Sequence, residues 1–198
     1  MKVCCLDLEG VLVPEVWIHV ARKFRMDSLK LTTRDIPDYD RLMRYRLAIL
    51  KKEGIRLRDI QAVIRTMSPL PGARTFLDRL RAEFPVIILS DTYYEFAAPL
   101  IQKLGRPVLF CNWLKTDRKG FIADYILRER DGKKKAVQGL KKIGFKVYAA
   151  GDSYNDLSML AAADRGILFR PPASIRKKLG RRFPVTRDHR SLLREFRS

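Results

Sequence analysis

The sequence predicts an α/β protein with a doubly wound parallel sheet and a small helical cap inserted after the first strand. Short apolar runs of strand length alternate with amphipathic helical stretches along most of the chain. Between Pro14 and Ser68 the pattern changes to helices alone. A chain of 198 residues has room for one such core with a small insert.

Four apolar runs are predicted to be buried strands of the sheet: residues 3–8, 86–89, 147–150 and 167–169. Strands that alternate with helices form βαβ units, which give a parallel sheet covered by helices on both faces. Ligands of such sheets bind beyond the carboxyl ends of the strands. We therefore expect the functional site immediately after these runs.

Two interruptions of this alternation define the predicted domain organisation. The helical stretch ends at the proline- and glycine-rich residues 68–72, which indicates a cap of residues 14–69 and a catalytic core of residues 1–13 and 70–198. A smaller interruption covers residues 111–127, where a turn-like segment at 117–120 separates two apolar stretches. This second pattern is typical of a β-hairpin.

The chain is strongly basic, with 41 Lys and Arg against 22 Asp and Glu, a net charge of +19 and a pI near 10.3. Such a charge raises the hypothesis of nucleic-acid binding. The bases are spread along the chain, however, and no basic stripe alternates with aromatic residues. A solvated surface that attracts small anionic substrates is the favoured interpretation. The one dense basic cluster is Arg176, Lys177, Lys178, Arg181 and Arg182.

Composition also predicts a cytoplasmic protein without membrane partners. No apolar run approaches the roughly 18 residues of a membrane span. Cys4, Cys5 and Cys111 match neither a disulfide framework nor a metal-ligand spacing, which favours reduced thiols. No signal peptide is expected, because the first strand begins at once and leads into acidic residues.

The first strand leads into Asp7-Leu8-Glu9-Gly10. Two acids at positions i and i+2 leave a strand on the same face, so both are able to address one ligand. A turn with solvated acids is the alternative, and the pattern alone does not separate the two.

The other strand ends carry more specific signals. Ser90-Asp91-Thr92 follows the second run, where hydroxyls and backbone N–H groups suit either a phosphate or a helix cap. The stretch from Gly151 to Asp156 places two carboxylates and the amide of Asn155 after a buried strand. This last stretch is the most specific motif in the chain.

Lys133 differs from the two lysines that follow it. Lys133, Ala136, Val137 and Leu140 share one face of a helix at i, i+3, i+4 and i+7. A solvated helix start is the ordinary expectation for a lysine triplet. The periodicity instead turns Lys133 inward, where it requires an anion.

These motifs together resemble those of the haloacid dehalogenase-like superfamily, whose core is a Rossmann-like sheet. The resemblance rests on four segments in order: Asp7-Leu8-Glu9-Gly10-Val11-Leu12-Val13, Leu89-Ser90-Asp91-Thr92, Lys133 and Gly151-Asp152-Ser153-Tyr154-Asn155-Asp156. Residues 32–40 and 90–96 further resemble a bacterial subgroup that combines phosphoserine phosphatase with phosphoserine:homoserine phosphotransferase activity.

The resemblance implies an aspartyl-phosphate mechanism with Mg²⁺ as cofactor. Asp7 would be the nucleophile and a metal ligand, Asp152 the second metal carboxylate, and Glu9 the acid–base residue with its carbonyl on the metal. The residues that would hold the phosphate or substrate are Ser90, the Asp91 backbone, Lys133 and Asn155. Asp156 would orient Lys133.

The same resemblance gives the cap a role in reading the amino-acid end of the substrate. Arg46 falls on the apolar face of a predicted helix, and its planar fork suits a carboxylate. Glu15 stands at a predicted helix start, where it complements the helix dipole; by similarity it would bind the ammonium group. Most of the superfamily has Asp where this chain has Glu9, and the phosphotransferase subgroup shares the Glu.

The sequence therefore predicts an Mg²⁺-dependent phosphoserine phosphatase that passes the phosphoryl group to homoserine when homoserine is present. Three alternatives stay open: a nucleic-acid-binding protein, a nucleic-acid 3′-phosphatase, and a phosphatase for another small phosphomonoester. The oligomeric state, monomer or homodimer, also stays open.

Overall fold

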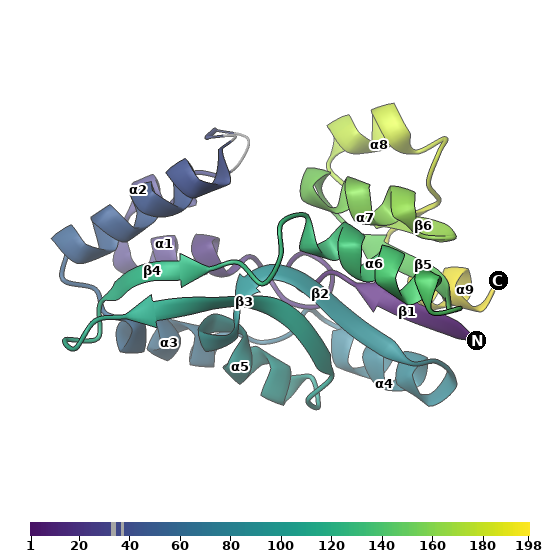
Figure 1. Cartoon of the computed structure of the whole chain (residues 1–198), viewed down its shortest axis with the longest axis horizontal. Coiled ribbons are helices and arrows are strands. Elements are labelled where there is room, and N and C mark those ends of the chain that lie inside the picture. The colour runs from purple at the N-terminus through teal and green to yellow at the C-terminus, as the bar shows by residue number, and fades with distance from the viewer. Residues whose placement is uncertain (33–34, 37) are drawn as a thin grey trace.

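A computed structural model describes residues 1–32, 35–36 and 38–198, and its centre is a seven-stranded sheet (Figure 1). The strands lie in the order β4-β3-β2-β1-β5-β6-β7, and every neighbouring pair is parallel except β3 and β4. Their bounds are β1 Lys2–Leu6, β2 Val86–Tyr93, β3 Val108–Thr116, β4 Ile122–Ile126, β5 Lys146–Gly151, β6 Arg165–Phe169 and β7 Val185–Thr186. The predicted fold class is confirmed.

Helices cover both faces of this sheet because its central strands are apolar on both sides. One face packs against α4 (Ala73–Glu83), α5 (Tyr94–Lys103) and α9 (His189–Arg197). The other packs against α6 (Gly132–Lys142), α7 (Leu157–Ala162) and α8 (Ala173–Leu179). Figure 1 shows the two layers on opposite sides of the sheet.

The segment between β1 and α4 is helical, as predicted. It holds α1 (Val16–Phe24), the 3-10 turn η1 (Asp27–Lys30), α2 (Tyr39–Lys52) and α3 (Leu57–Thr66). Helix α3 packs on α5, and α2 contacts β4, so these helices lie over the carboxyl end of the sheet beside the β3–β4 hairpin (Figure 1).

The two connections of this helical segment run side by side. The Leu70 N–H donates to the Leu12 carbonyl at 2.9 Å. The ring of His189 lies between the carbonyls of Val11 and Pro71, with nitrogen–oxygen distances of 2.8 and 3.2 Å. The division into a core of residues 1–13 and 70–198 and a cap of 14–69 remains a prediction.

Several element boundaries differ from the sequence prediction. Strand β1 ends at Leu6, so Asp7 and Leu8 lie past it. Strand β2 continues through Ser90 to Tyr93, with a register shift against β3 between Leu89 and Tyr93. Ser90 and Thr92 therefore do not cap α5, and that alternative was wrong. The hairpin at 111–127 is confirmed, although its first strand begins earlier and belongs to the main sheet.

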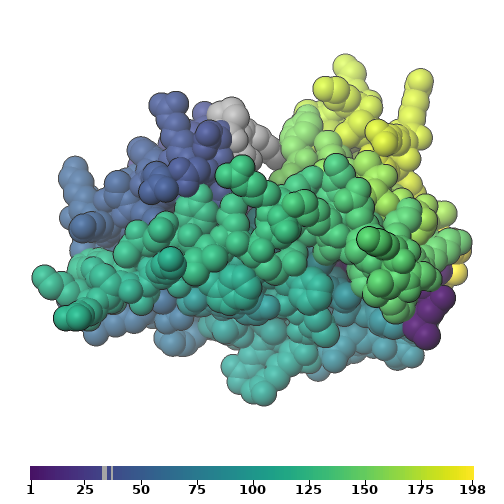
Figure 2. Space-filling model, in the orientation of Figure 1, coloured from purple at the N-terminus to yellow at the C-terminus, as the bar shows by residue number. Residues whose placement is uncertain are grey.

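The surface carries the basic cluster at one end of the molecule. Its five lysines and arginines, on and just after α8, are all exposed. Figure 2 shows the α8 segment, in yellow, projecting at the opposite end from the helices of residues 16–66, in blue. Among the residues that the structure describes, no helix has the length and apolar character that crossing a bilayer requires.

Candidate active site

Asp7 lies at the middle of the carboxyl edge of the sheet, directly after β1. Its backbone N–H donates to the Ala150 carbonyl at 2.9 Å, and its Oδ1 accepts from the Leu8 N–H at 2.8 Å. The residue is only 4% exposed. Because β2 and β5 flank β1, Asp7 stands between the segments that carry Ser90 and Asp152.

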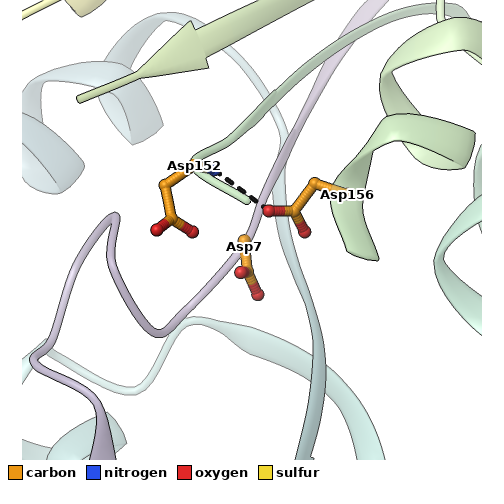
Figure 3. A group of neighbouring side chains, drawn as sticks. All are labelled: Asp7, Asp152 and Asp156. Atoms are coloured by element: carbon orange, nitrogen blue, oxygen red, sulfur yellow. Dashed lines mark hydrogen bonds between the residues drawn. The ribbon is translucent and has the colours of Figure 1, made fainter. Parts of the chain in front are cut away.

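Asp152 and Asp156 bring two further carboxylates to Asp7 (Figure 3). One oxygen of each of the three residues lies within 4.8 Å of the others. Two glycines permit this approach. A Cβ at Gly10 would stand 2.4 Å from Asp152 Cγ, and one at Gly151 would stand 2.4 Å from Asp156 Cγ. Side chains at these positions would therefore displace the carboxylates.

The carboxylate cluster fits a divalent cation. Asp152 Oδ1 is buried and accepts no hydrogen bond from any residue that the structure describes. Burial and repulsion from Asp156 raise the pKa of Asp152 to about 7, and the same two causes raise the pKa of Asp7 well above its ordinary value. A divalent cation would give the free oxygen a partner and offset the repulsion.

Lys133 enters the cluster from the start of α6. Its Nζ lies 2.7 Å from Asp156 Oδ1, 3.0 Å from Asp7 Oδ1 and 3.2 Å from Asp91 Oδ2. Lys133 alone of its triplet is buried, as its helical position predicts. Burial opposes its charged form, but the three carboxylates outweigh burial and raise its pKa well above the ordinary value. The ammonium therefore remains charged at neutral pH.

Asp156 holds Lys133 in place from a fully buried position. Its Oδ2 accepts the backbone N–H groups of Asp152 and Ser153 at 3.0 and 3.1 Å, while Oδ1 accepts from Lys133. Both oxygens are thus engaged, in contrast to the free oxygen of Asp152. This arrangement suits a residue that orients its neighbours.

Ser90, Asp91 and Asn155 border the same network. Ser90 is buried, and its Oγ accepts the Thr92 N–H at 3.2 Å. The Asn155 amide donates to Asp91 Oδ2 at 3.2 Å. The sequence assigned only the Asp91 backbone to the site, whereas its carboxylate also contacts Lys133 and Asn155.

Glu9 and Glu15 form a second acidic group beside the first. Glu9 Oε2 accepts the N–H of Val16, the first residue of α1, at 2.8 Å. Burial and the neighbouring Glu15 raise the pKa of Glu9 to about 8. A carboxyl group that exchanges its proton near neutral pH is suited to general acid–base chemistry. Glu15 itself is exposed and makes no cap bond to α1.

Arg46 is buried on α2, as its place on an apolar face predicts. Its guanidinium lies 4.4 Å from the Trp17 ring centroid, and Nη2 donates to the Leu31 carbonyl at 2.7 Å. Nε is buried and has no partner among the described residues. A buried guanidinium with one unpaired donor makes Arg46 a candidate for binding an anion.

The structure brings further residues to the site that the sequence had not singled out. Tyr39 on α2 reaches the end of β2, where its hydroxyl lies 2.7 Å from that of Tyr93 and donates to the Asp91 carbonyl at 3.3 Å. Tyr39 falls within residues 32–40, which already carried the resemblance. Three positions of that stretch, Thr33, Arg34 and Pro37, lie outside the described residues.

A family comparison decides what these motifs mean. The profile of the haloacid dehalogenase-like hydrolases matches residues 1–164. The chain belongs to this family. The family resemblance of the four motifs is thereby confirmed, and the cluster of Asp7, Asp152 and Asp156 is consistent with a divalent-metal site.

Two bacterial relatives of this haloacid dehalogenase-like hydrolase share half of their aligned residues with it. The phosphoserine phosphatase ThrH of Pseudomonas aeruginosa is 50% identical over 196 residues, covering 99% of this chain and 95% of the relative. A phosphoserine phosphatase of Pseudomonas syringae is 50% identical over 196 residues, covering 99% of this chain and 82% of the relative.

Solved structures share the fold at lower identity. The crystal structure of an apo phosphoserine phosphatase has a TM-score of 0.79 at 21% identity and covers 98% of each chain. A structure described as a phospho-aspartyl intermediate analogue of phosphoserine phosphatase has a TM-score of 0.79 at 20% identity, covering 98% of this chain and 97% of that one.

Proposed function

We propose that this hydrolase cleaves O-phosphoserine through an aspartyl phosphate formed on Asp7. The observation that carries the proposal is the buried network in which Lys133 joins Asp7 to Asp156, with Asp152 beside them. The names of the two relatives at 50% identity support phosphoserine as the substrate.

Two transfers of the phosphoryl group make up the reaction. In the first, an Asp7 carboxylate oxygen attacks phosphorus, the bond to the serine oxygen breaks, and Glu9 donates its proton to that oxygen. In the second, Glu9 takes a proton from water, the water oxygen attacks phosphorus, and the Asp7 carboxylate leaves. The pKa of Glu9, raised to about 8, supports its use in both directions.

The phosphoryl oxygens require cationic and hydrogen-bonding partners. Lys133 supplies a fixed ammonium, and Ser90 with the Asp91 backbone supplies donors at the adjacent end of β2. Asn155 borders the same space and would contact the substrate. These groups are already held in place before the substrate binds. They would therefore stabilise the charge of the transition state without having to rearrange.

Mg²⁺ is the proposed cofactor because all candidate ligands are oxygens. Asp7, Asp152 and the Glu9 carbonyl would hold it. When bound, the ion would withdraw negative charge from the phosphoryl group and from the carboxylates beside Asp7.

The amino-acid end of the substrate is assigned to the cap. Arg46 would bind the serine carboxylate, which supplies the anion that its free Nε requires. Glu15 would bind the ammonium group, and its closeness to Glu9 supports this role, because that group would then lie beside the reacting oxygen. We also retain residues 14–69 as the cap domain, a proposal supported by the side-by-side connections at Leu12 and Leu70.

Homoserine is the proposed second acceptor. It carries the same ammonium and carboxylate as serine, so it would reuse Glu15 and Arg46. Its hydroxyl lies one methylene further out, within reach of the phosphorylated Asp7 with Glu9 as base. An oriented alcohol competes with bulk water through its high effective molarity.

A substrate panel in Mg²⁺ tests the proposal. It compares O-phosphoserine, O-phosphothreonine, p-nitrophenyl phosphate and a 3′-phosphorylated oligonucleotide by release of inorganic phosphate. We expect the highest kcat/KM for phosphoserine, loss of activity in EDTA and recovery with Mg²⁺. The oligonucleotide represents the nucleic-acid alternative that the +19 charge raises. A higher kcat/KM for it would replace phosphoserine as the assigned substrate.

A further inference from the structure

Asn112 is a buried amide within the otherwise apolar part of β3. It is 6% exposed, and both ends of its side chain are bonded. Nδ2 donates to the Asp91 carbonyl at 3.0 Å, and Oδ1 accepts the Arg128 N–H at 3.0 Å. A buried amide is costly unless it is fully paired, and here both partners are backbone groups of other segments.

The first of these segments lacks regular strand pairing. Asp91 lies within the register shift of β2 against β3, between Leu89 and Tyr93. The regular ladder therefore does not fix its peptide. Its carbonyl is held instead by the Asn112 amide and, at 3.3 Å, by the Tyr39 hydroxyl.

The second segment leads into α6 and so into Lys133. Arg128 lies between β4 and α6, and its Nη2 donates to the Gly132 carbonyl at 3.1 Å. Its guanidinium lies 5.2 Å from the Phe110 ring centroid, which fixes it against β3. Through its two hydrogen bonds, Asn112 thus links two segments to β3: the Asp91 peptide and the residues just before α6.

A single small cavity brings these groups together. Its lining includes Ser90, Asp91, Asn112, Arg128 and Lys133. Three of these residues are the ones assigned to the phosphoryl oxygens. Asn112 therefore lies beside residues assigned to the phosphoryl oxygens without belonging to any of the four motifs.

We propose that Asn112 is a positioning residue for phosphate binding. Its two hydrogen bonds set the Asp91 peptide and the start of α6 so that Ser90, the Asp91 N–H and Lys133 Nζ converge on one phosphoryl group. The inference rests on the proposed function only in that the site binds a phosphoryl group. It does not depend on serine as the leaving group.

Asn112→Asp is the central test, with Asn112→Ala beside it. Aspartate keeps the volume and the acceptor for Arg128 but turns an oxygen toward the Asp91 carbonyl, so only one of the two ties is broken. The readouts are the inhibition constant of inorganic phosphate and kcat/KM, both measured with p-nitrophenyl phosphate in Mg²⁺. An error in the phosphoserine assignment changes neither readout.

The matched control is Leu109→Ala on the same strand. Leu109 is buried in the core, so its truncation lowers Tm without removing a side-chain hydrogen bond. We expect both Asn112 variants to raise the inhibition constant of phosphate and to lower kcat/KM by about tenfold or more, roughly the effect of one lost buried hydrogen bond. We expect the control to leave the inhibition constant within about twofold of wild type.

Two results would overturn the proposal. One is an Asn112→Asp enzyme whose phosphate inhibition constant equals that of wild type. The other is a loss of phosphate affinity in Leu109→Ala as large as in the Asn112 variants, which would make the effect one of general stability. Because a new carboxylate also repels phosphate by its charge, the uncharged alanine variant must show the same loss; if it does not fold, Asn112→Ser is measured in its place.

Discussion

Gly10→Ala is expected to disable the carboxylate cluster while the fold persists. Gly10 has φ +79°, a conformation that costs a residue with a Cβ about 1–2 kcal/mol. The new Cβ would lie 2.4 Å from Asp152 Cγ, whereas ordinary contacts begin at 3.4 Å. Asp152 must therefore move by about 1 Å, and a displacement of that size costs roughly 100-fold in rate.

The added Cβ overlaps the carboxylate end of the Asp152 side chain. We therefore expect the effect of this overlap to appear in Mg²⁺ binding and turnover. The stability cost is that of the backbone alone, a fall in Tm of about 2–8 °C for a chain of this size. The assay measures kcat with saturating phosphoserine across an Mg²⁺ titration. We expect kcat to fall about 100-fold and the Mg²⁺ concentration for half activity to rise.

Gly54→Ala provides the matched control. Gly54 also has a positive φ, +69°, but nothing lies within 4 Å of the added Cβ. The control should lose comparable stability and keep the activity and Mg²⁺ dependence of wild type. Equal losses of activity in the two variants would refute the reasoning, because backbone strain and not the approach to Asp152 would then be responsible.

Three further predictions concern the cap, the C-terminal helix and the acceptor. Arg46→Ala should weaken phosphoserine turnover by roughly 2–5 kcal/mol and spare p-nitrophenyl phosphate; equal losses on both substrates would make Arg46 structural. Burial lowers the pKa of His189 below its ordinary 6.5, so the unfolded state binds a proton first and the free energy of unfolding falls as pH drops below about 6.5. Urea unfolding of His189→Gln should show a flatter pH dependence than wild type, and an unchanged slope would contradict this. Homoserine added with phosphoserine should yield O-phosphohomoserine by ³¹P NMR; phosphate release that still matches serine one for one would restrict the enzyme to hydrolysis.

The sequence predicted the parts of the fold that depend on local patterns. The central strands are continuous apolar runs, and the inward turn of Lys133 and Arg46 follows from helical spacing. These features need no knowledge of distant partners. Strand β7 has only two residues, and β2 continues through polar residues past a register shift, so neither has a usable periodicity.

The parts of the site that the sequence could not predict depend on contacts between distant segments. Asn112 bonds Asp91 and Arg128, which lie 21 and 16 residues away. Tyr39 meets Tyr93 across 54 residues. A polar residue within an apolar strand was the available signal for Asn112, but its partners became evident only from the strand register. The motif glycine Gly10 was visible, whereas its close approach to Asp152 was not.

The central claim is that Asp7 carries the phosphoryl group, and acid quenching of the reaction tests it most directly. Enzyme, Mg²⁺ and ³²P-labelled phosphoserine are mixed, quenched within the first turnover and digested for peptide mapping. We predict base-labile label on the peptide that contains Asp7, and no label in the Asp7→Asn enzyme, whose circular dichroism should match wild type. Label on a different residue, or turnover by wild type without any labelled peptide, would contradict the covalent mechanism.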